Sequence, residues 1–197
     1  MDRTNQKSES MIIQLCGLSG VGKSTICQLV SEKLKPSGIP CEIIDGDDYR
    51  ELLCRDLGFS RQDRNENIRR LGFVASKLSA HGVVSIICAI NPYQEIRDEL
   101  SEKYRNVKTV FVDCQLEELK KRDTKGLYRR AMLPSGDPQH IPNLTGVNDP
   151  FDIPLNPDLY INTGRRSKDA CAKLLFSFIL KHAEENMLLH YHGRMAV

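Results

Sequence analysis

Short apolar runs alternate with segments of helical periodicity along most of the 197-residue chain. Most of these runs end at glycine or at polar residues, and short continuous apolar runs are typical of strands buried on both faces of a sheet. The pattern predicts about five strands, at residues 11–16, 41–44, 83–89, 107–112 and 159–161.

The segments between these strands carry apolar residues at helical spacing, as at Ile26, Val30 and Leu34. They predict helices over 23–35, 61–81, 92–103, 116–123 and 168–184. Strands that are separated by helical crossovers indicate an α/β fold, in which helices cover both faces of a parallel sheet. Ligands of such sheets bind at the carboxyl ends of the strands, so the residues that follow each strand are the candidates for a site.

Residues 124–157 break the alternation, because they hold most of the nine prolines and show little periodicity. A structureless loop of this length inside a compact domain is usually a lid or a surface insertion. The basic residues Lys125, Arg129 and Arg130 at its start favour a lid that closes over phosphates.

Composition narrows the class of protein. The net charge of +2 is too small for a nucleic-acid or membrane-surface binder, and no apolar run is long enough to span a membrane. The seven cysteines contain no C-x-x-C pair, which indicates reduced thiols in a cytoplasmic protein. Residues 1–10 are polar and are expected to be a disordered lead-in.

The segment from Gly17 to Ser24 matches G-x-x-x-x-G-K-[ST] and lies between a predicted strand and a predicted helix. Backbone N–H groups of such a P-loop surround phosphates, aided by the helix dipole. Lys23 is expected to reach the β- and γ-phosphates, and the Ser24 hydroxyl to bind Mg²⁺. The chain lacks the guanine-binding and switch motifs of a GTPase and is short for a helicase, which favours a kinase with a small-molecule acceptor.

Two carboxylates, Asp45 and Asp47, follow the second predicted strand and should lie beside the P-loop. One carboxylate of such a pair is able to hold Mg²⁺ or its waters while the other accepts a proton from the attacking hydroxyl. A solvated acidic turn is the alternative, because Asp-Gly is a common turn pair.

Residues 58–70 place arginines and amides on the first turns of a predicted helix. Such residues are suited to clamp an anionic acceptor, and Phe59 offers a flat face on which a base is able to stack. The combination D-G-D-x-x-R and G-F-S-x-x-D-R-x-x-N-I-R-R resembles the adenylyl-sulfate kinase family. Ala89-Ile-Asn-Pro-Tyr93, Arg122-Asp-x-Lys-Gly-Leu-Tyr128 and Thr145-Gly146 agree with it, and the resemblance covers about residues 11–185.

The resemblance implies a P-loop NTPase-type kinase domain over 11–186, with its lid at about 124–157, and a C-terminal tail at 187–197. It implies transfer of a phosphoryl group from ATP, with Mg²⁺, to the 3′-hydroxyl of adenosine 5′-phosphosulfate. Asp47 would be the base, Asp45 and Ser24 would lie at the metal, and Lys23 would act on the phosphates. ATP would contact Gly17, Leu18, Ser19, Gly20, Val21, Gly22, Lys23, Ser24, Thr25, Arg122 and Lys125, with Arg122 near adenine. The acceptor would contact Asp47, Arg50, Phe59, Arg64, Asn67, Ile90 and Arg97.

Asn91 and the lid depart from the usual family pattern. Asn91 replaces a serine and is unable to carry a phosphoryl group, and the lid is several residues longer between Ala131 and Thr145. Leu144 stands where a phenylalanine would stack on the acceptor base, and no lysine is present at 142–143. Losing one stacking face would remove about 1–3 kcal/mol.

These departures leave two alternatives to the sulfate nucleotide as acceptor. The first is a sister kinase for another nucleotide conjugate, such as cytidine diphosphoramidate, and the second is a non-catalytic nucleotide sensor. An intact Lys23, Ser24 and Asp47 argue against a sensor. Relatives are commonly dimers, so a homodimer is possible, whereas nucleic-acid and membrane partners are not expected.

Overall fold

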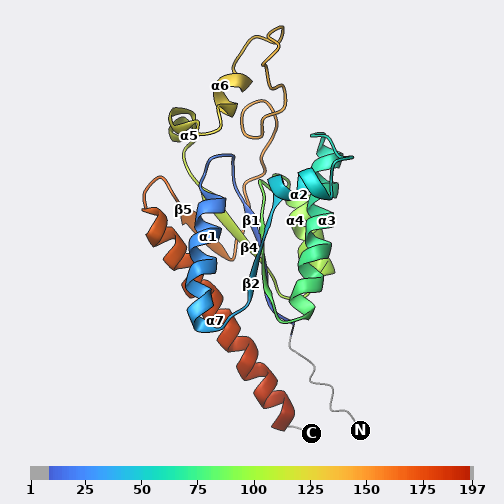
Figure 1. Ribbon diagram of the computed structural model, residues 1–197, viewed down its shortest axis with the longest axis vertical. Helices are drawn as coiled ribbons and strands as arrows, with labels where there is room; N and C mark the ends of the chain where they lie inside the picture. Colours follow the sequence, from blue (N-terminus) through green and yellow to red (C-terminus); the bar gives the residue numbers. More distant parts are fainter. Residues whose placement is uncertain (1–8, 196–197) are drawn as a thin grey trace.

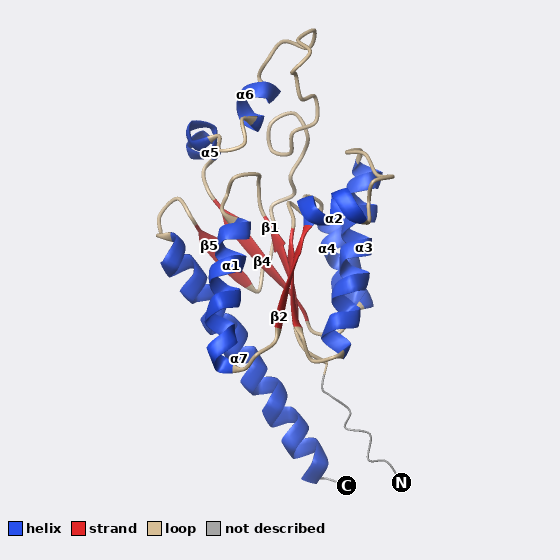
Figure 2. Ribbon diagram, viewed as in Figure 1, coloured by secondary structure: helices blue, strands red, loops and turns tan. Residues whose placement is uncertain are grey.

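The computed structural model describes the backbone of residues 9–195 and the side chains of residues 9–183. Five parallel strands form one sheet in the order β2-β3-β1-β4-β5, which confirms the predicted fold class (Figure 1, Figure 2). The strands are β1 (Ile12–Cys16), β2 (Cys41–Asp45), β3 (Val84–Cys88), β4 (Val107–Asp113) and β5 (Leu159–Asn162). Because β1 lies between β3 and β4, the loops that follow these strands meet at one edge of the sheet.

Helices cover both faces of the sheet, as Figure 1 shows. On one face lie α1 (Lys23–Leu34) and α7 (Lys168–Met195), and on the other α3 (Arg61–Ala80) and α4 (Gln94–Lys103). The alternation of side chains along β1 supplies both cores: Leu15 packs in the α1 cluster, whereas Ile12 packs in the α3 cluster. The structure continues α7 to Met195, well beyond the predicted end at 184, so most of the expected tail is helical.

Two short helices were not predicted, α2 (Gly46–Leu52) and α6 (Leu127–Ala131). Their first turns depend on single aspartates. The Asp45 carboxylate accepts a hydrogen bond from Asp47 N at 2.9 Å, and the Asp123 carboxylate accepts from the N–H groups of Tyr128 and Arg129 at 3.0 Å. A side-chain cap of this kind allows a helix to start where the apolar pattern is too short to indicate one. The remaining elements are the 3₁₀ helix η1 (Lys35–Ser37) and α5 (Leu116–Arg122).

The lid, residues 124–157, lies above the carboxyl ends of the strands (Figure 1). Although the lid shows little periodicity, three of its residues, Tyr128, Ala131 and Leu144, are buried in the α1-side core. The Tyr128 hydroxyl donates to Ser19 O at 2.8 Å, and the Asn148 side chain accepts from Leu144 N at 2.6 Å. The base of the lid is therefore packed onto the P-loop.

The predicted lead-in at residues 1–8 lies outside the described residues. Ser10 is hydrogen-bonded through its backbone N–H and carbonyl to Ser79 on α3. Within the part of the chain that the structure describes, no helix is long and apolar enough to cross a membrane. The seven cysteines are free thiols, and six of them are buried.

Candidate active site

The P-loop connects β1 to α1 at the edge where the strands end. Gly17 adopts φ +151°, and a Cβ at this position would lie 2.2 Å from Val112 O on β4. Only glycine therefore fits between the two strands. Gly17 N also donates to Ile90 O at 3.1 Å, which joins the start of the P-loop to the loop after β3.

Lys23 begins α1 and is almost fully buried. Its ammonium donates to Gly17 O at 2.8 Å and to Leu18 O at 2.9 Å. Burial lowers the pKa of Lys23. The thiol of Cys88, the carboxylate of Asp47 and the thiols of Cys16 and Cys27 partly oppose this shift. An ammonium has three donors, so one remains for a phosphate oxygen in the cavity above the loop.

Ser24 and Asp45 form the part of the site that is suited to a metal ion. The Ser24 hydroxyl donates to Asp45 Oδ2 at 2.9 Å, and both residues line the main cavity. A hydroxyl and a carboxylate are hard oxygen ligands, and Mg²⁺ is usually held by one or two such groups together with phosphates and water. The residues present therefore fit Mg²⁺ bound to a nucleotide.

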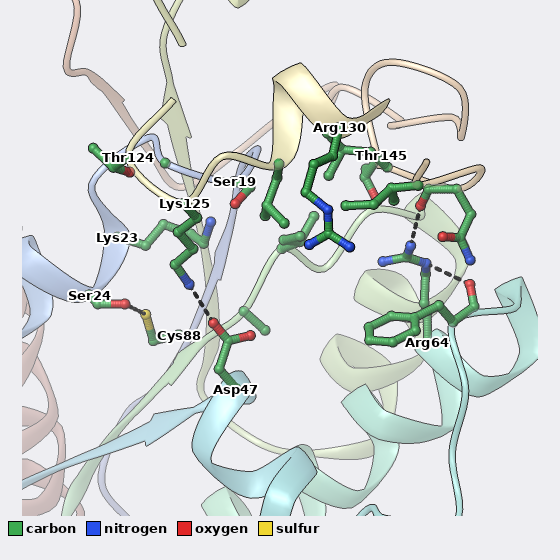
Figure 3. A pocket seen from close by; sticks show the side chains of 18 of the residues that line it. Ser19, Lys23, Ser24, Asp47, Arg64, Cys88, Thr124, Lys125, Arg130 and Thr145 are labelled. Atoms are coloured by element: carbon green, nitrogen blue, oxygen red, sulfur yellow. Dashed lines mark hydrogen bonds and ion pairs between the residues drawn. The ribbon is translucent and has the colours of Figure 1, made fainter. Parts of the chain in front are cut away.

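Asp47 projects from the first turn of α2 into the same cavity, whose volume is about 760 Å³. Lys125 of the lid reaches down to it, with its Nζ 2.6 Å from Asp47 Oδ2 (Figure 3). This hydrogen bond is the main cause that raises the pKa of Lys125. Both side chains are more than half exposed, at 55% for Lys125 and 76% for Asp47, so the pair is screened by solvent and is able to separate at little cost.

The opposite wall comes from the α2–α3 region. The Phe59 ring is 55% exposed, and the guanidinium carbons of Arg50 and Arg64 lie 4.7 Å and 5.5 Å from its centroid. Arg64 is nearly buried and donates to Phe59 O at 3.0 Å and to Asn143 O of the lid at 2.7 Å. Burial lowers the pKa of Arg50, which donates to Gly58 O at 2.8 Å.

The structure brings most of the predicted residues to this cavity but not all of them. Phe59, Arg64 and Ile90 line it, whereas Arg50 and Asn67 do not. Asn67 is buried, and its Oδ1 has no hydrogen-bond partner. Arg122 lines a smaller hollow together with Ser19 and Gly20 of the P-loop, and its Nη2 donates to Thr163 O at 3.5 Å.

Arg97 was expected in the acceptor pocket, but it lies inside the protein and is only 1% exposed. Its guanidinium donates to Asn91 O at 2.8 Å and to Asp152 O at 2.6 Å. The Asn91 side chain in turn donates to Gln14 Oε1 at 3.1 Å. Arg97 therefore holds the loop after β3 against the end of the lid and does not reach the cavity wall.

Sequence reasoning missed several residues of the wall. Cys88 lies with its sulfur 3.5 Å from Ser24 Oγ. Hydrogen bonding with Cys27 is the main cause that lowers the pKa of Cys88, and burial opposes this shift. His140 also reaches the cavity from the lid, as does Arg130, which the sequence placed only in the basic group at the start of the lid. The signal for Cys88 was its place at the end of a predicted strand, whereas a lid without periodicity gives no indication of which side chains point inward.

The parallel sheet, the P-loop and the carboxylates that face it define a P-loop kinase. The sequence model of the adenylylsulphate kinase family matches residues 9–162. The chain belongs to this family.

Individual relatives agree. The adenylyl-sulfate kinase of Gloeothece citriformis is 44% identical over 163 residues, which cover 83% of this chain and 90% of the relative. That of Deinococcus deserti is 44% identical over 165 residues, covering 83% and 88%. The structure of the Mycobacterium tuberculosis APS kinase in complex with AMPPNP and APS superposes with a TM-score of 0.77, at 36% identity, and covers 88% of this chain and 98% of that one.

Proposed function

We propose that the protein transfers the γ-phosphoryl group of ATP to the 3′-hydroxyl of adenosine 5′-phosphosulfate, which gives 3′-phosphoadenosine 5′-phosphosulfate and ADP. The observation that carries this proposal is the position of Asp47. Its carboxylate lies on the wall of one cavity that also contains Lys23 and Ser24 on the P-loop side and Phe59 and Arg64 on the other. Membership of the adenylylsulphate kinase family supports the choice of acceptor.

On the donor side, the P-loop would hold the phosphates of ATP, and Lys23 would neutralise the β- and γ-phosphates. Ser24 and Asp45 would hold Mg²⁺, which, when bound, supplies further charge neutralisation on the phosphates. Arg122, in the smaller hollow beside the P-loop, would lie near the adenine. The free donor of Lys23 and the oxygen pair of Ser24 and Asp45 support this arrangement.

On the acceptor side, the exposed Phe59 ring would stack on the base. Asp47 would accept the proton of the 3′-hydroxyl as its oxygen attacks the γ-phosphorus and the bond to the β-phosphate oxygen breaks. Lys125 would leave the Asp47 carboxylate for the transferring group, because the exposed pair separates easily. Catalysis would come mainly from positioning and charge neutralisation.

An assay of ADP release with a panel of acceptors tests the proposal. We expect turnover with adenosine 5′-phosphosulfate and none when Lys23 is changed to Ala. Turnover with a cytidine conjugate in place of the sulfate nucleotide would overturn the choice of acceptor and leave the kinase class intact. Tight ATP binding without turnover on any acceptor would indicate a sensor.

We also propose that the protein forms a homodimer. The support is self-association in one structural relative, the hexameric APS kinase from Thiobacillus denitrificans, which is 25% identical and of whose chain the match covers 30%. Sedimentation of the purified chain measures this state, and a monomer at micromolar concentration would overturn the proposal.

A further inference from the structure

Arg130 is the second basic residue of the lid at the main cavity. The sequence places it in a basic group that is expected to close over phosphates, but the proposed mechanism gives it no role. It sits at the end of α6, and Figure 3 shows its guanidinium pointing down from the lid into the cavity, toward the same region as Arg64. Arg130 Nε donates to Gln139 O at 3.1 Å, and Arg130 O accepts from Ile141 N at 3.3 Å. The long part of the lid therefore holds this side chain in place.

The other cations of the cavity already have partners. Lys23 donates to two carbonyls of the P-loop, Lys125 is paired with Asp47, and Arg64 donates to Phe59 O and Asn143 O. Among the described residues, Arg130 has a partner only for its Nε and for its backbone. Its two terminal nitrogens form a free planar fork, which suits two oxygens of a phosphate or a sulfate.

The place of the fork identifies the ligand. Arg130 and Arg64 carry like charges and point to the same part of the cavity, an arrangement that an anion between them would stabilise. This part lies on the side of Phe59 and Asn143, whereas the oxygens of Ser24 and Asp45 mark the donor side. The anion expected here therefore belongs to the acceptor and not to ATP.

We propose that Arg130 binds the acidic 5′ group of the acceptor nucleotide from the lid side, opposite Arg64. The backbone around Gln139 and Ile141 orients it, which gives the lengthened lid a role in acceptor specificity. This inference rests on the proposed function, since it presumes a nucleotide acceptor with a charged 5′ end.

Three variants separate charge from shape. Arg130→Met keeps the length and removes the charge, Arg130→Gln is a second neutral variant, and Arg130→Lys keeps the charge without the fork. The neighbouring Arg129 is exposed and does not line the cavity, so Arg129→Met is the matched control. Thermal unfolding of each variant checks that the fold is retained.

The neutral variants should raise the KM of adenosine 5′-phosphosulfate about ten- to hundred-fold, the loss typical of hydrogen bonds to charged groups, and change the KM of ATP less than about two-fold. Arg130→Lys should lie between them and the wild type, and Arg129→Met should match the wild type. Raised KM for ATP with an unchanged acceptor KM would assign Arg130 to the donor and overturn the inference. Unchanged values for both substrates would overturn it as well.

Direct binding distinguishes this inference from the proposed function. Calorimetry with adenosine 5′-monophosphate and with uncharged adenosine needs no turnover. Loss of Arg130 should weaken the binding of adenosine 5′-monophosphate at least about ten-fold and leave the affinity for adenosine unchanged. Binding with this pattern but without turnover would overturn the function alone, and equal effects on both ligands, or no binding of the charged one, would overturn the role of Arg130.

Discussion

Lys125 Nζ lies 2.6 Å from Asp47 Oδ2, so a residue of the lid is paired with the carboxylate that we propose as the base. The two residues are 78 positions apart in the sequence, and only the fold of the lid over α2 brings them together. In the proposed mechanism the Asp47 carboxylate therefore binds either the ammonium of Lys125 or the hydroxyl of the acceptor.

Asp47→Asn is expected to lower kcat about 10²- to 10⁴-fold, because the amide keeps the size of the side chain but loses the basic oxygen. The acceptor KM should change much less. Steady-state kinetics with both substrates measure this. Asp48→Asn is the control, since Asp48 is exposed on the same helix and does not line the cavity.

The assignment within the carboxylate pair is reversed if Asp45→Asn abolishes turnover while Asp47→Asn does not. With our assignment, Asp45→Asn should instead increase the Mg²⁺ concentration that half-saturates the enzyme. Asparagine also caps helices well, so α2 should be retained in this variant.

Arg97→Met should lower stability and leave the acceptor site largely intact. Removing the guanidinium leaves the buried carbonyl of Asn91 without its donor, at about 1–3 kcal/mol, and also frees the part-buried carbonyl of Asp152. Urea unfolding measures the loss, and Arg105→Met on the exposed surface is the control. Normal stability together with a raised acceptor KM would contradict this prediction and show that Arg97 acts in the acceptor pocket.

Transfer should proceed without a phosphorylated enzyme. Asn91 stands where a serine is usual in the family, it is 1% exposed, and its amide donates to Gln14. An amide of this kind has no hydroxyl to phosphorylate. Protein incubated with γ-labelled ATP and no acceptor should stay unlabelled, and label that later moves into product would contradict this mechanism.

Limited proteolysis should cut the lid first, between residues 124 and 154, and ATP with acceptor should protect it. The contacts of Tyr128 narrow the expected site to the exposed stretch around Met132 and Gly136, because the start of the lid is packed. Tyr128→Phe removes the bond to Ser19 O and should speed cleavage. Equal cleavage with and without ligands would make the segment a plain insertion.

The sheet and the P-loop could be predicted because their signals are local. Five apolar runs located the five strands, and one glycine-rich motif located the P-loop. The structure agrees within a few residues at each strand end. The direction of a side chain is not local. Arg97 was assigned to the pocket by the family resemblance, yet it turns inward because Asn91 O and Asp152 O, far apart in sequence, need a donor.

The lid is a second case in which the position of side chains could not be predicted from the sequence. Its apolar residues are too few for a periodic pattern, but Tyr128 and Leu144 are buried because the P-loop and α1 offer them a surface that exists only in the folded chain. The position of Arg130 over the cavity likewise depends on a hydrogen bond to Gln139. No spacing in the sequence indicates that bond.

The hydrogen bond from Gly17 N to Ile90 O, described above, links the loop that begins the donor site to the loop that borders the acceptor site. Both loops extend from neighbouring strands, β1 and β3, whose register is fixed by the ladder between Ile12 and Leu15 and their partners. The separation of the two substrates is therefore set by the sheet and not by the lid. A lid of different length is then able to evolve over the same pair of loops without moving the reacting atoms apart, which accounts for the extension between Ala131 and Thr145 in a kinase that keeps the P-loop and the D-G-D-x-x-R motif.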